Sequence, residues 1–263
     1  MDLGLNNKSV LVLASSKGLG KATAAQFARE GARVYLASRD EKALEQTAEA
    51  IIAETGNKQV SYGRCDMTNY DSIKQLVADA AWTNDGIDVL VNNTGGPPAG
   101  AFDDVDDQAW QHAFELNLLS FIRAIREVLP HMRKGGGGHI INFASSSIKQ
   151  PIDNLILSNT FRAGITGLSK SLSQELAGDN ILINTIGPGR ISTDRVQSLD
   201  NMKADALNME VKDLKASIEE QIPIGRYGEP EEFAKLAVFL CSAANTYMTG
   251  QSLLVDGGMV KAL

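Results

Sequence analysis

The chain has 263 residues, a formal net charge of −7 at pH 7 and 43% hydrophobic residues. That length suits one large α/β domain with a sizeable core, and the composition excludes a disordered chain. The acidic balance argues against a nucleic-acid partner. No stretch reaches the roughly 18 apolar residues of a membrane span, so we expect no membrane partner either.

The two cysteines and the first residues of the chain indicate in which cellular compartment the protein is expected. The two cysteines, Cys65 and Cys241, both lie in apolar or strand-like runs, which argues against a disulfide framework and favours a reducing environment. The first residues carry neither a basic segment nor a long apolar one, so no signal peptide is predicted. We therefore expect a cytoplasmic protein.

Short apolar runs alternate with longer helical stretches along the chain. The runs predict strands at Ser9–Ala14, Arg33–Ser38, Gln59–Cys65, Asp88–Asn92, His139–Ala144, Ile181–Ile186 and Ser252–Val255. The stretches predict helices at Leu19–Glu30, Glu41–Glu54, Ser72–Trp82, Asp107–Leu129, Leu155–Ala177 and Pro230–Ser242. Because strands that alternate with such helices form right-handed βαβ units, the sequence predicts a single α/β domain over residues 1–263. Its core would be a doubly wound parallel sheet of about seven strands, with helices on both faces.

One segment departs from this alternation. Residues 192–222 contain helical stretches but no strand, between the sixth and seventh predicted strands. An insertion at that point would lie near the carboxyl ends of the strands, where ligands bind in open α/β sheets. We therefore predict a helical lid over the substrate.

A turn with two glycines follows the first strand and opens the first helix. Glycine lets the backbone approach a pyrophosphate, and a helix N-terminus offers free N–H groups and a positive dipole end. An ordinary strand–helix turn is the alternative, but strand, turn, helix and second strand arrive in the order that a dinucleotide site requires. The predicted phosphate-binding residues are Ser15, Ser16, Lys17, Gly18, Leu19 and Gly20.

The end of the second strand indicates which dinucleotide binds. An acidic residue about 20 positions after the glycines would accept the ribose 2′-hydroxyl of NAD. Ser38 and Arg39 stand there instead, and both can donate hydrogen bonds to the 2′-phosphate of NADP. Asp40 is expected to cap the next helix. The sequence therefore favours NADP over NAD.

Further motifs follow in chain order: Asn92-Asn93-Thr94-Gly95, Asn117, the strand that leads to Ser145, and Pro188-Gly189. Together with the glycine turn, they resemble the short-chain dehydrogenase/reductase family, with the Rossmann fold, over nearly the whole chain. The resemblance implies adenine contacts from Asp66 and Met67 and cofactor contacts from the turn that holds Asn93 and Gly95. It also implies that Asn117 is a helix asparagine that supports a catalytic water chain and that Ser145 is the catalytic serine. Pro188, Gly189 and Thr193 would form the loop on the nicotinamide side of the cofactor. The C-terminal residues 222–232 and 247–258 are similar to the oxoacyl-carrier-protein-reductase-like branch.

The departures from the family fall in its chemistry. Its catalytic tyrosine and lysine correspond to Ser158 and Arg162, and Ala14 replaces its first glycine. A reduced carbonyl needs a proton, and a serine hydroxyl is a poorer acid than a phenol and reaches less far. A water held by Ser158 could supply that proton. Arg162 could bond the nicotinamide ribose and hold a positive charge near the reacting oxygen, but a guanidinium does not relay protons.

These observations lead to one preferred function and two alternatives. We expect an NADP-dependent oxidoreductase that exchanges a hydride with a small carbonyl or alcohol substrate through an altered catalytic set. The first alternative is an NADP(H)-binding protein without dehydrogenase activity, such as a sensor or assembly subunit. The second, resting on Ala14, is a protein that no longer binds nucleotide.

Partners other than the substrate follow from spacing and from the resemblance. No cluster of histidine, cysteine and acidic residues has metal-ligand spacing, so we expect no metal. The family commonly pairs its two long helices with a second subunit. The resemblance therefore implies a homo-oligomer, a tetramer or a dimer, which the apolar tail Met259–Leu263 could join.

Overall fold

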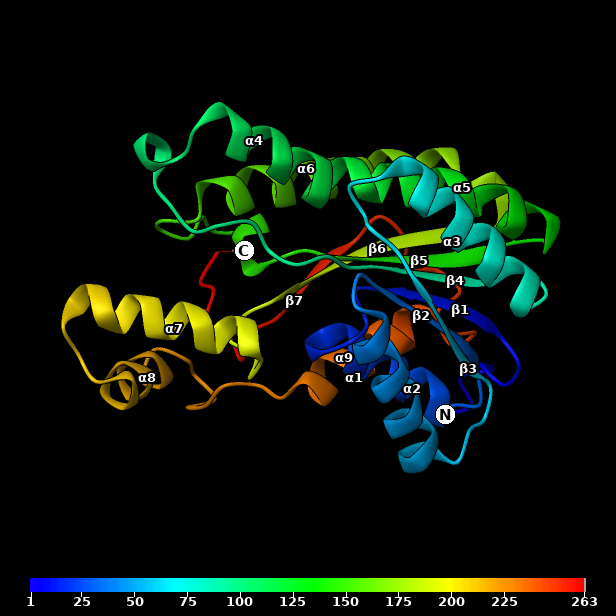
Figure 1. Ribbon diagram of the computed structural model, residues 1–263, viewed down its shortest axis with the longest axis horizontal. Coiled ribbons are helices and arrows are strands. Elements are labelled where there is room, and N and C mark those ends of the chain that lie inside the picture. Colours follow the sequence, from blue (N-terminus) through cyan, green and yellow to red (C-terminus); the bar gives the residue numbers. More distant parts are fainter. Residues whose placement is uncertain (263) are drawn as a thin grey trace.

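A parallel sheet runs through the centre of the computed structural model, which describes residues 1–262 (Figure 1). The strand order is β3-β2-β1-β4-β5-β6-β7, and every neighbouring pair is parallel. Because β1 lies in the middle and is covered on both sides, all five of its residues are buried. The strands are β1 (Ser9–Leu13), β2 (Arg33–Ser38), β3 (Val60–Arg64), β4 (Val89–Asn92), β5 (Gly138–Phe143), β6 (Ile181–Pro188) and β7 (Ser252–Val255).

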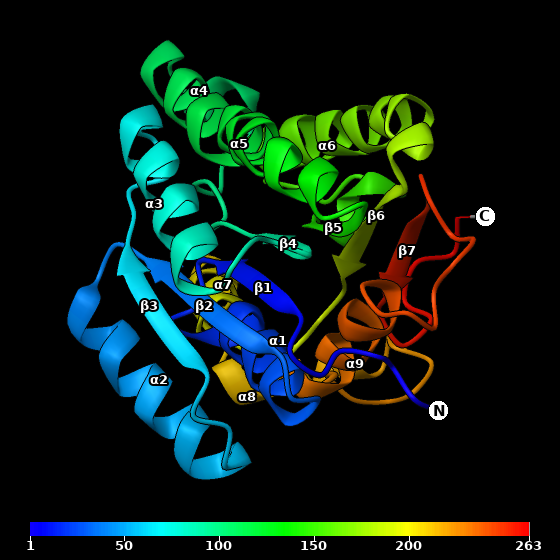
Figure 2. The same cartoon turned by 90° about the vertical axis from the view of Figure 1, so that its right-hand side faces the viewer.

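Helices cover both faces of the sheet, which confirms the predicted doubly wound domain (Figure 2). On one face, α1, α2 and α9 enclose a core that includes Phe27, Leu44 and Phe233. On the other face, α3 and α5 enclose a second core around Leu90 and Ile140, beside α6. These helices are α1 (Gly18–Arg29), α2 (Glu41–Thr55), α3 (Tyr70–Thr83), α5 (Ser120–Lys134), α6 (Ile156–Glu175) and α9 (Pro230–Leu240).

The predicted helix Asp107–Leu129 has a different form in the structure. It begins as α4 (Asp107–Phe114), passes through a π-helical turn, η2 (Glu115–Leu119), and continues as α5 to Lys134. The predicted end at Leu129 was wrong because α5 accommodates Pro130 in its interior instead of stopping before it. The π turn matters for function, since it carries Asn117.

The segment 192–222 forms two helices, α7 (Asp194–Leu207) and α8 (Val211–Glu219), which stand apart from the main layers (Figure 1). They have a small core of their own, which includes Ala204, Leu214 and Tyr227. Asp200 anchors them: its carboxylate lies 2.7 Å from the Arg190 guanidinium, and the Tyr227 hydroxyl donates to it at 3.0 Å. The pair of helices is therefore attached to the loop after β6 through a buried charged contact.

The C-terminal tail folds back onto this pair of helices. Met259 packs against the core of α7 and α8, and the backbone N–H of Val260 donates to Asp256 at 2.9 Å. These two tail residues are partly exposed, and the contact between subunits that the sequence suggested for the tail stays a prediction. Leu263, the last residue of the predicted tail, lies outside the described residues.

Candidate active site

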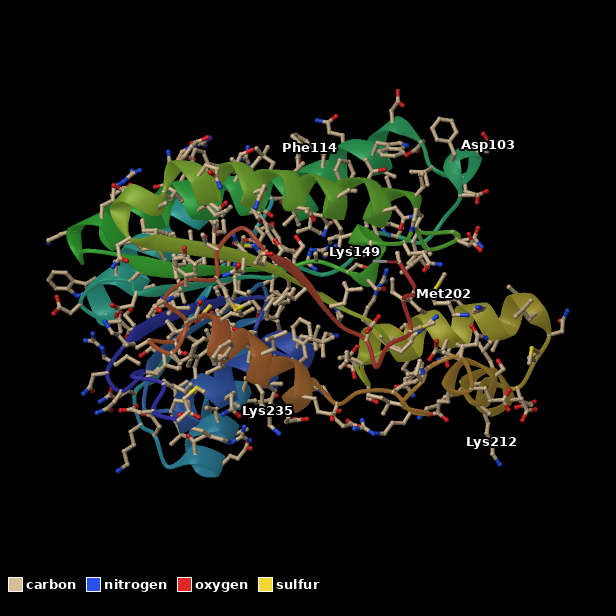
Figure 3. The ribbon with its side chains drawn as sticks, turned by 180° about the vertical axis from the view of Figure 1, so that it is seen from behind. Asp103, Phe114, Lys149, Met202, Lys212 and Lys235 are labelled. Carbon is tan, nitrogen blue, oxygen red and sulfur yellow. The ribbon has the colours of Figure 1, made fainter. Side chains whose placement is uncertain are left out.

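A large cleft opens at the carboxyl ends of the parallel strands. Its volume is about 1430 Å³, enough for a dinucleotide together with a small substrate. The turns after β1, β2, β4 and β5 and the loop after β6 line one side, and α7 and the C-terminal tail line the other. Figure 3 labels Met202 on α7 and Lys149, which follows β5, and neither of them lines the cleft.

The turn between β1 and α1 has the shape of a phosphate cradle. Gly18 has a φ of +56°, and a Cβ on Gly20 would lie 2.4 Å from the carbonyl oxygen of Ala14, so glycine is required there. No acidic residue occupies the first turn of α1, and Lys17, Gly18 and Leu19 at its start line the cleft. Ala14 itself adopts the left-handed region with a φ of +47°. Position 14 therefore has a backbone conformation that glycine adopts more readily than alanine.

The end of β2 brings the predicted NADP-selecting residues into the cleft. Ser38 and the exposed Arg39 line it, and Asp40 caps α2 by accepting the N–H of Ala43 at 3.0 Å, as expected. Asp66 does not line the cleft: its carboxylate accepts the N–H and hydroxyl of Thr68. These bonds, with the nearby Arg39, lower the pKa of Asp66 and keep it anionic.

A second turn, after β4, is held in place by asparagines. The Asn93 amide donates to the carbonyl oxygen of Ala14 at 3.2 Å and so joins the two turns. The Asn117 amide donates to the Thr94 hydroxyl at 3.0 Å and to the Gly95 carbonyl at 2.7 Å. Asn117 does not itself line the cleft, and its buried Oδ1 has no hydrogen-bond partner. The Asn117 side chain therefore holds this turn from the protein interior and not from the cleft.

Two hydroxyls stand in the part of the cleft near the end of β5. The Ser145 oxygen accepts the N–H of Ser147 at 3.1 Å, which leaves the Ser145 O–H hydrogen for another acceptor. Ser158, in the first turn of α6, lines the same cleft. None of the five tyrosines, all of them among the residues described, lines it. Among residues 1–262, no phenol therefore lies in the wall of this cleft.

Arg162 lies one helical turn beyond Ser158, with only 5% of its surface exposed. Its Nη1 donates to the carbonyl oxygen of Phe143 at 2.7 Å, and its guanidinium lies 5.8 Å from the Phe121 ring centroid. Desolvation, followed by repulsion from Arg195, lowers the pKa of Arg162 to about 10. The group therefore keeps its positive charge at neutral pH, at the floor of the cleft.

Arg195, which the sequence analysis missed, is a second cation of this cleft. It is the second residue of α7, and its Nη2 donates to the carbonyl oxygen of Pro97 at 2.7 Å. It is exposed at the mouth, and partial desolvation lowers its pKa. No motif marked it, because 98 residues separate the two partners of this contact.

Most of the predicted site residues therefore meet in one cleft. Those that line it are Ser16, Lys17, Gly18, Leu19, Ser38, Arg39, Met67, Asn93, Gly95, Ser145, Ser158, Arg162, Pro188, Gly189 and Thr193. Those that do not line it are Ser15, Gly20, Asp66 and Asn117. Ser15 is fully buried, and its hydroxyl accepts the N–H of Ala37, so its side chain holds the turn against β2.

Two further searches covered the described residues. Within residues 1–262, no three histidine, cysteine or acidic side chains are placed to share a metal ion. Over the same range, every helix is too short or too polar to cross a bilayer.

Comparisons with known proteins place this architecture. Residues 13–260 match the family model described as enoyl-(acyl carrier protein) reductase. The chain is 33% identical over 255 residues to the rabbit (Oryctolagus cuniculus) dehydrogenase/reductase SDR family member 4, covering 97% of this chain and 94% of that protein. It is 34% identical to the 3-oxoacyl-[acyl-carrier-protein] reductase FabG of Chlamydia pneumoniae, covering 98% and 99% of the two chains.

This chain also superposes closely on a solved structure. The L-sorbose reductase of Gluconobacter frateurii, complexed with NADPH and L-sorbose, superposes with a TM-score of 0.94 at 33% identity, over 100% of both chains. Fold, cofactor-type turns and sequence similarity over nearly the whole length agree, and the chain belongs to the short-chain dehydrogenase/reductase family of enzymes.

Proposed function

We propose that this protein is an NADP(H)-dependent oxidoreductase that exchanges a hydride with a small carbonyl or alcohol substrate without a tyrosine acid. The observation that carries the proposal is the single cleft that joins the phosphate cradle of α1 to Ser145, Ser158 and Arg162. The relatives support the cofactor, since the sorbose reductase was solved with NADPH. Their names support carbonyl reduction.

The residues present fit a bound NADP(H). The glycine turn at the start of α1 provides N–H donors and no acidic side chain for the pyrophosphate. Ser38 and Arg39 would hold the 2′-phosphate, whereas Lys17 forms an exposed ion pair of 3.6 Å with Asp194 across the mouth. The pair would have to separate if Lys17 is to reach the phosphate. When bound, the dinucleotide supplies or accepts the hydride.

The chain's own groups would do the rest of the chemistry. The free O–H of Ser145 would donate to the substrate carbonyl, and the cation of Arg162 would stabilise negative charge on that oxygen. Ser158 would hold the water that delivers the proton, because a serine hydroxyl is itself a weak acid. Asn117 would act as a positioning residue through the turn at Gly95.

The helices α7 and α8 would form the lid of this site. Their anchor at Asp200 fixes one end, and α7 lines the cleft with Val196 and Leu199, which would enclose an apolar part of the substrate. Closure would exclude water from the hydride path.

The test is turnover of NADPH with a broad carbonyl panel and of NADP with the matching alcohols. We expect Ser158→Ala to lower kcat about 10- to 100-fold with an unchanged Kd for NADPH, because the variant loses a proton path and not a cofactor contact. Ser171→Ala is the matched control, since it removes an exposed hydroxyl from the same helix and should change neither quantity.

The outcomes separate the proposal from its alternatives. Tight NADPH binding with no turnover above a cofactor-only blank would show a binding protein without dehydrogenase activity. No thermal shift with NADPH or NADP would show that the chain has lost nucleotide binding altogether.

A further inference from the structure

Arg162 is a buried cation whose countercharge is missing from the protein. The carbonyl oxygen of Phe143 satisfies one of its donors, and this acceptor is neutral. Among residues 1–262, no carboxylate forms an ion pair with this guanidinium. Burying an unpaired charge is costly, and a ribose hydroxyl would accept a hydrogen bond without neutralising that charge.

Arg195 adds a second positive charge that faces the same space. Its Nη2 also rests on a neutral acceptor, the carbonyl oxygen of Pro97, and no carboxylate of the described chain pairs with it. Arg162 and Arg195 line the same cleft, and the charge of Arg195 contributes to the lowered pKa of Arg162. Two guanidinium groups that repel each other across a cleft are stabilised together by an anion between them.

The acidic side chains that line the cleft do not supply the anion between the two guanidinium groups. Asp40 caps α2 at the adenine end, and Asp194 pairs with Lys17 at the mouth. Asp153 is exposed and forms no ion pair within residues 1–262. The remaining source of negative charge is a ligand.

The phosphates of the cofactor already have places of their own. The cradle at the start of α1 fits the pyrophosphate, and Ser38 with Arg39 fits the 2′-phosphate. Arg162 lies beyond both, one helical turn from Ser158 and bonded to the last residue of β5. The unassigned anion therefore belongs beside the reacting carbonyl.

We infer that the substrate carries a carboxylate that Arg162 and Arg195 bind together, and that it is a short oxo acid. This inference rests on the proposed function, because it concerns the same cleft. Ser158 and Arg162 stand at i and i+4, so their Cβ atoms lie roughly 6 Å apart and the carboxylate must lie close to the carbonyl. The cleft wall at Ile152 and Leu155 is apolar and suits a short aliphatic body.

The reaction then balances as one reduction. The carbonyl carbon of the oxo acid gains a hydride from NADPH, and its C=O π bond breaks. The oxygen takes a proton from solvent, and a hydroxy acid and NADP⁺ leave. The carboxylate stays ionised throughout and serves only as the handle.

The experiment compares each acid with its neutral ester. The probes are pyruvate, acetoacetate and 4-oxopentanoate, each beside its methyl ester, with NADPH as reductant. We expect the best acid to exceed its ester in kcat/KM by about 10- to 100-fold, as expected for a hydrogen-bonded charge. An ester used as well as its acid, for every pair, would overturn the inference while leaving the reductase itself established.

Substitution of Arg195 tests the site directly. Arg195→Gln should reduce the acid-over-ester preference by about tenfold or more, with Arg195→Lys between it and the native protein. Lys212→Gln removes one positive charge from the outer side of the same lid and should leave the preference unchanged (Figure 3). If Arg195→Gln instead weakens NADPH binding and keeps the preference, the arginine serves the cofactor and the inference fails.

A binding measurement keeps the inference separate from catalysis. Titration of the NADP⁺-saturated protein with 3-hydroxybutanoate should show saturable binding that Arg195→Gln weakens about tenfold or more. Binding of this kind without any turnover would support the carboxylate site and reject hydride transfer. Absence of binding by each of the hydroxy acids that match the three probes would reject the carboxylate site, whatever the turnover with esters.

Discussion

Ala14 is a non-glycine residue in a backbone conformation that favours glycine. Its φ of +47° lies in the left-handed region, which costs an alanine about 1–2 kcal/mol relative to the right-handed form. We expect Ala14→Gly to raise the free energy of unfolding by about 0.5–1 kcal/mol, because released strain exceeds the added chain entropy of glycine. Urea unfolding measures it.

The control for this change is Ala25→Gly, a buried position inside α1 with ordinary helical geometry. It should lower the free energy of unfolding by about 1 kcal/mol, the helix cost of glycine. If Ala14→Gly destabilised the protein as much as Ala25→Gly does, the strain assigned to Ala14 would be absent.

For single residues of the candidate site, the sequence predicted position but not burial or pairing. The motifs located Ser145, Ser158 and Arg162 because each has a fixed spacing from a recognisable strand or helix. Burial and pairing are different, because they depend on contacts far along the chain. The unpaired state of Arg162 and the approach of Arg195 to Pro97 therefore required the structure.

At the scale of elements, the attachment of α7 and α8 depends on the contact between Asp200 and its two partners, Arg190 and Tyr227. Burial and the hydrogen bond to Asp200 raise the pKa of Tyr227 above its ordinary value near 10. Tyr227 is then protonated in the folded state at a pH where the unfolded chain ionises. The contribution of Tyr227 to the free energy of unfolding is therefore complete below about pH 10 and is lost as the pH rises further.

We expect Tyr227→Phe to remove this tyrosine's part of the alkaline loss. The free energy of unfolding, measured between pH 8 and pH 11, should fall less steeply in the variant than in the native protein. At pH 7 the variant should be about 1 kcal/mol less stable, because the hydroxyl no longer bonds Asp200. Equal slopes above about pH 10 would contradict the raised pKa of Tyr227.

Secondary structure was largely predictable because buried parallel strands and amphipathic helices differ in period. All seven strands lie where the apolar runs placed them: two have the predicted bounds, and the ends of the others shift by at most two residues. The π turn at Glu115–Leu119 was not predictable, since the hydrophobic period does not encode a change in hydrogen-bond register. Nor was the passage of α5 through Pro130, which by itself indicates a helix end.

At the scale of the whole molecule, we predict a homo-oligomer built on the long helices of one face. Phe114 on α4 keeps 38% of its surface exposed beside Trp110 and Phe161, and it lies on the outer side of this face (Figure 3). Sedimentation should give the mass of a dimer or a tetramer. Phe114→Glu should shift the protein toward smaller species, because it places a charge in an apolar contact.

Trp82→Glu provides the comparison, since Trp82 is a larger aromatic on α3 with 90% of its surface exposed. It lies outside the proposed interface, so the assembly should be unchanged. A native protein that sediments as a monomer would reject the oligomer, as would a loss of assembly with Trp82→Glu but not with Phe114→Glu.

The central claim is that this chain transfers a hydride although serine stands in the place of the family's tyrosine. The direct test incubates the protein with NADPH deuterated at nicotinamide C4 and with the carbonyl panel, followed by mass spectrometry of the products. The account predicts one deuterium on the carbinol carbon of at least one product, and none without protein. The account would be contradicted if the protein binds NADPH but no compound of the panel gains deuterium with either C4 epimer of the deuterated cofactor.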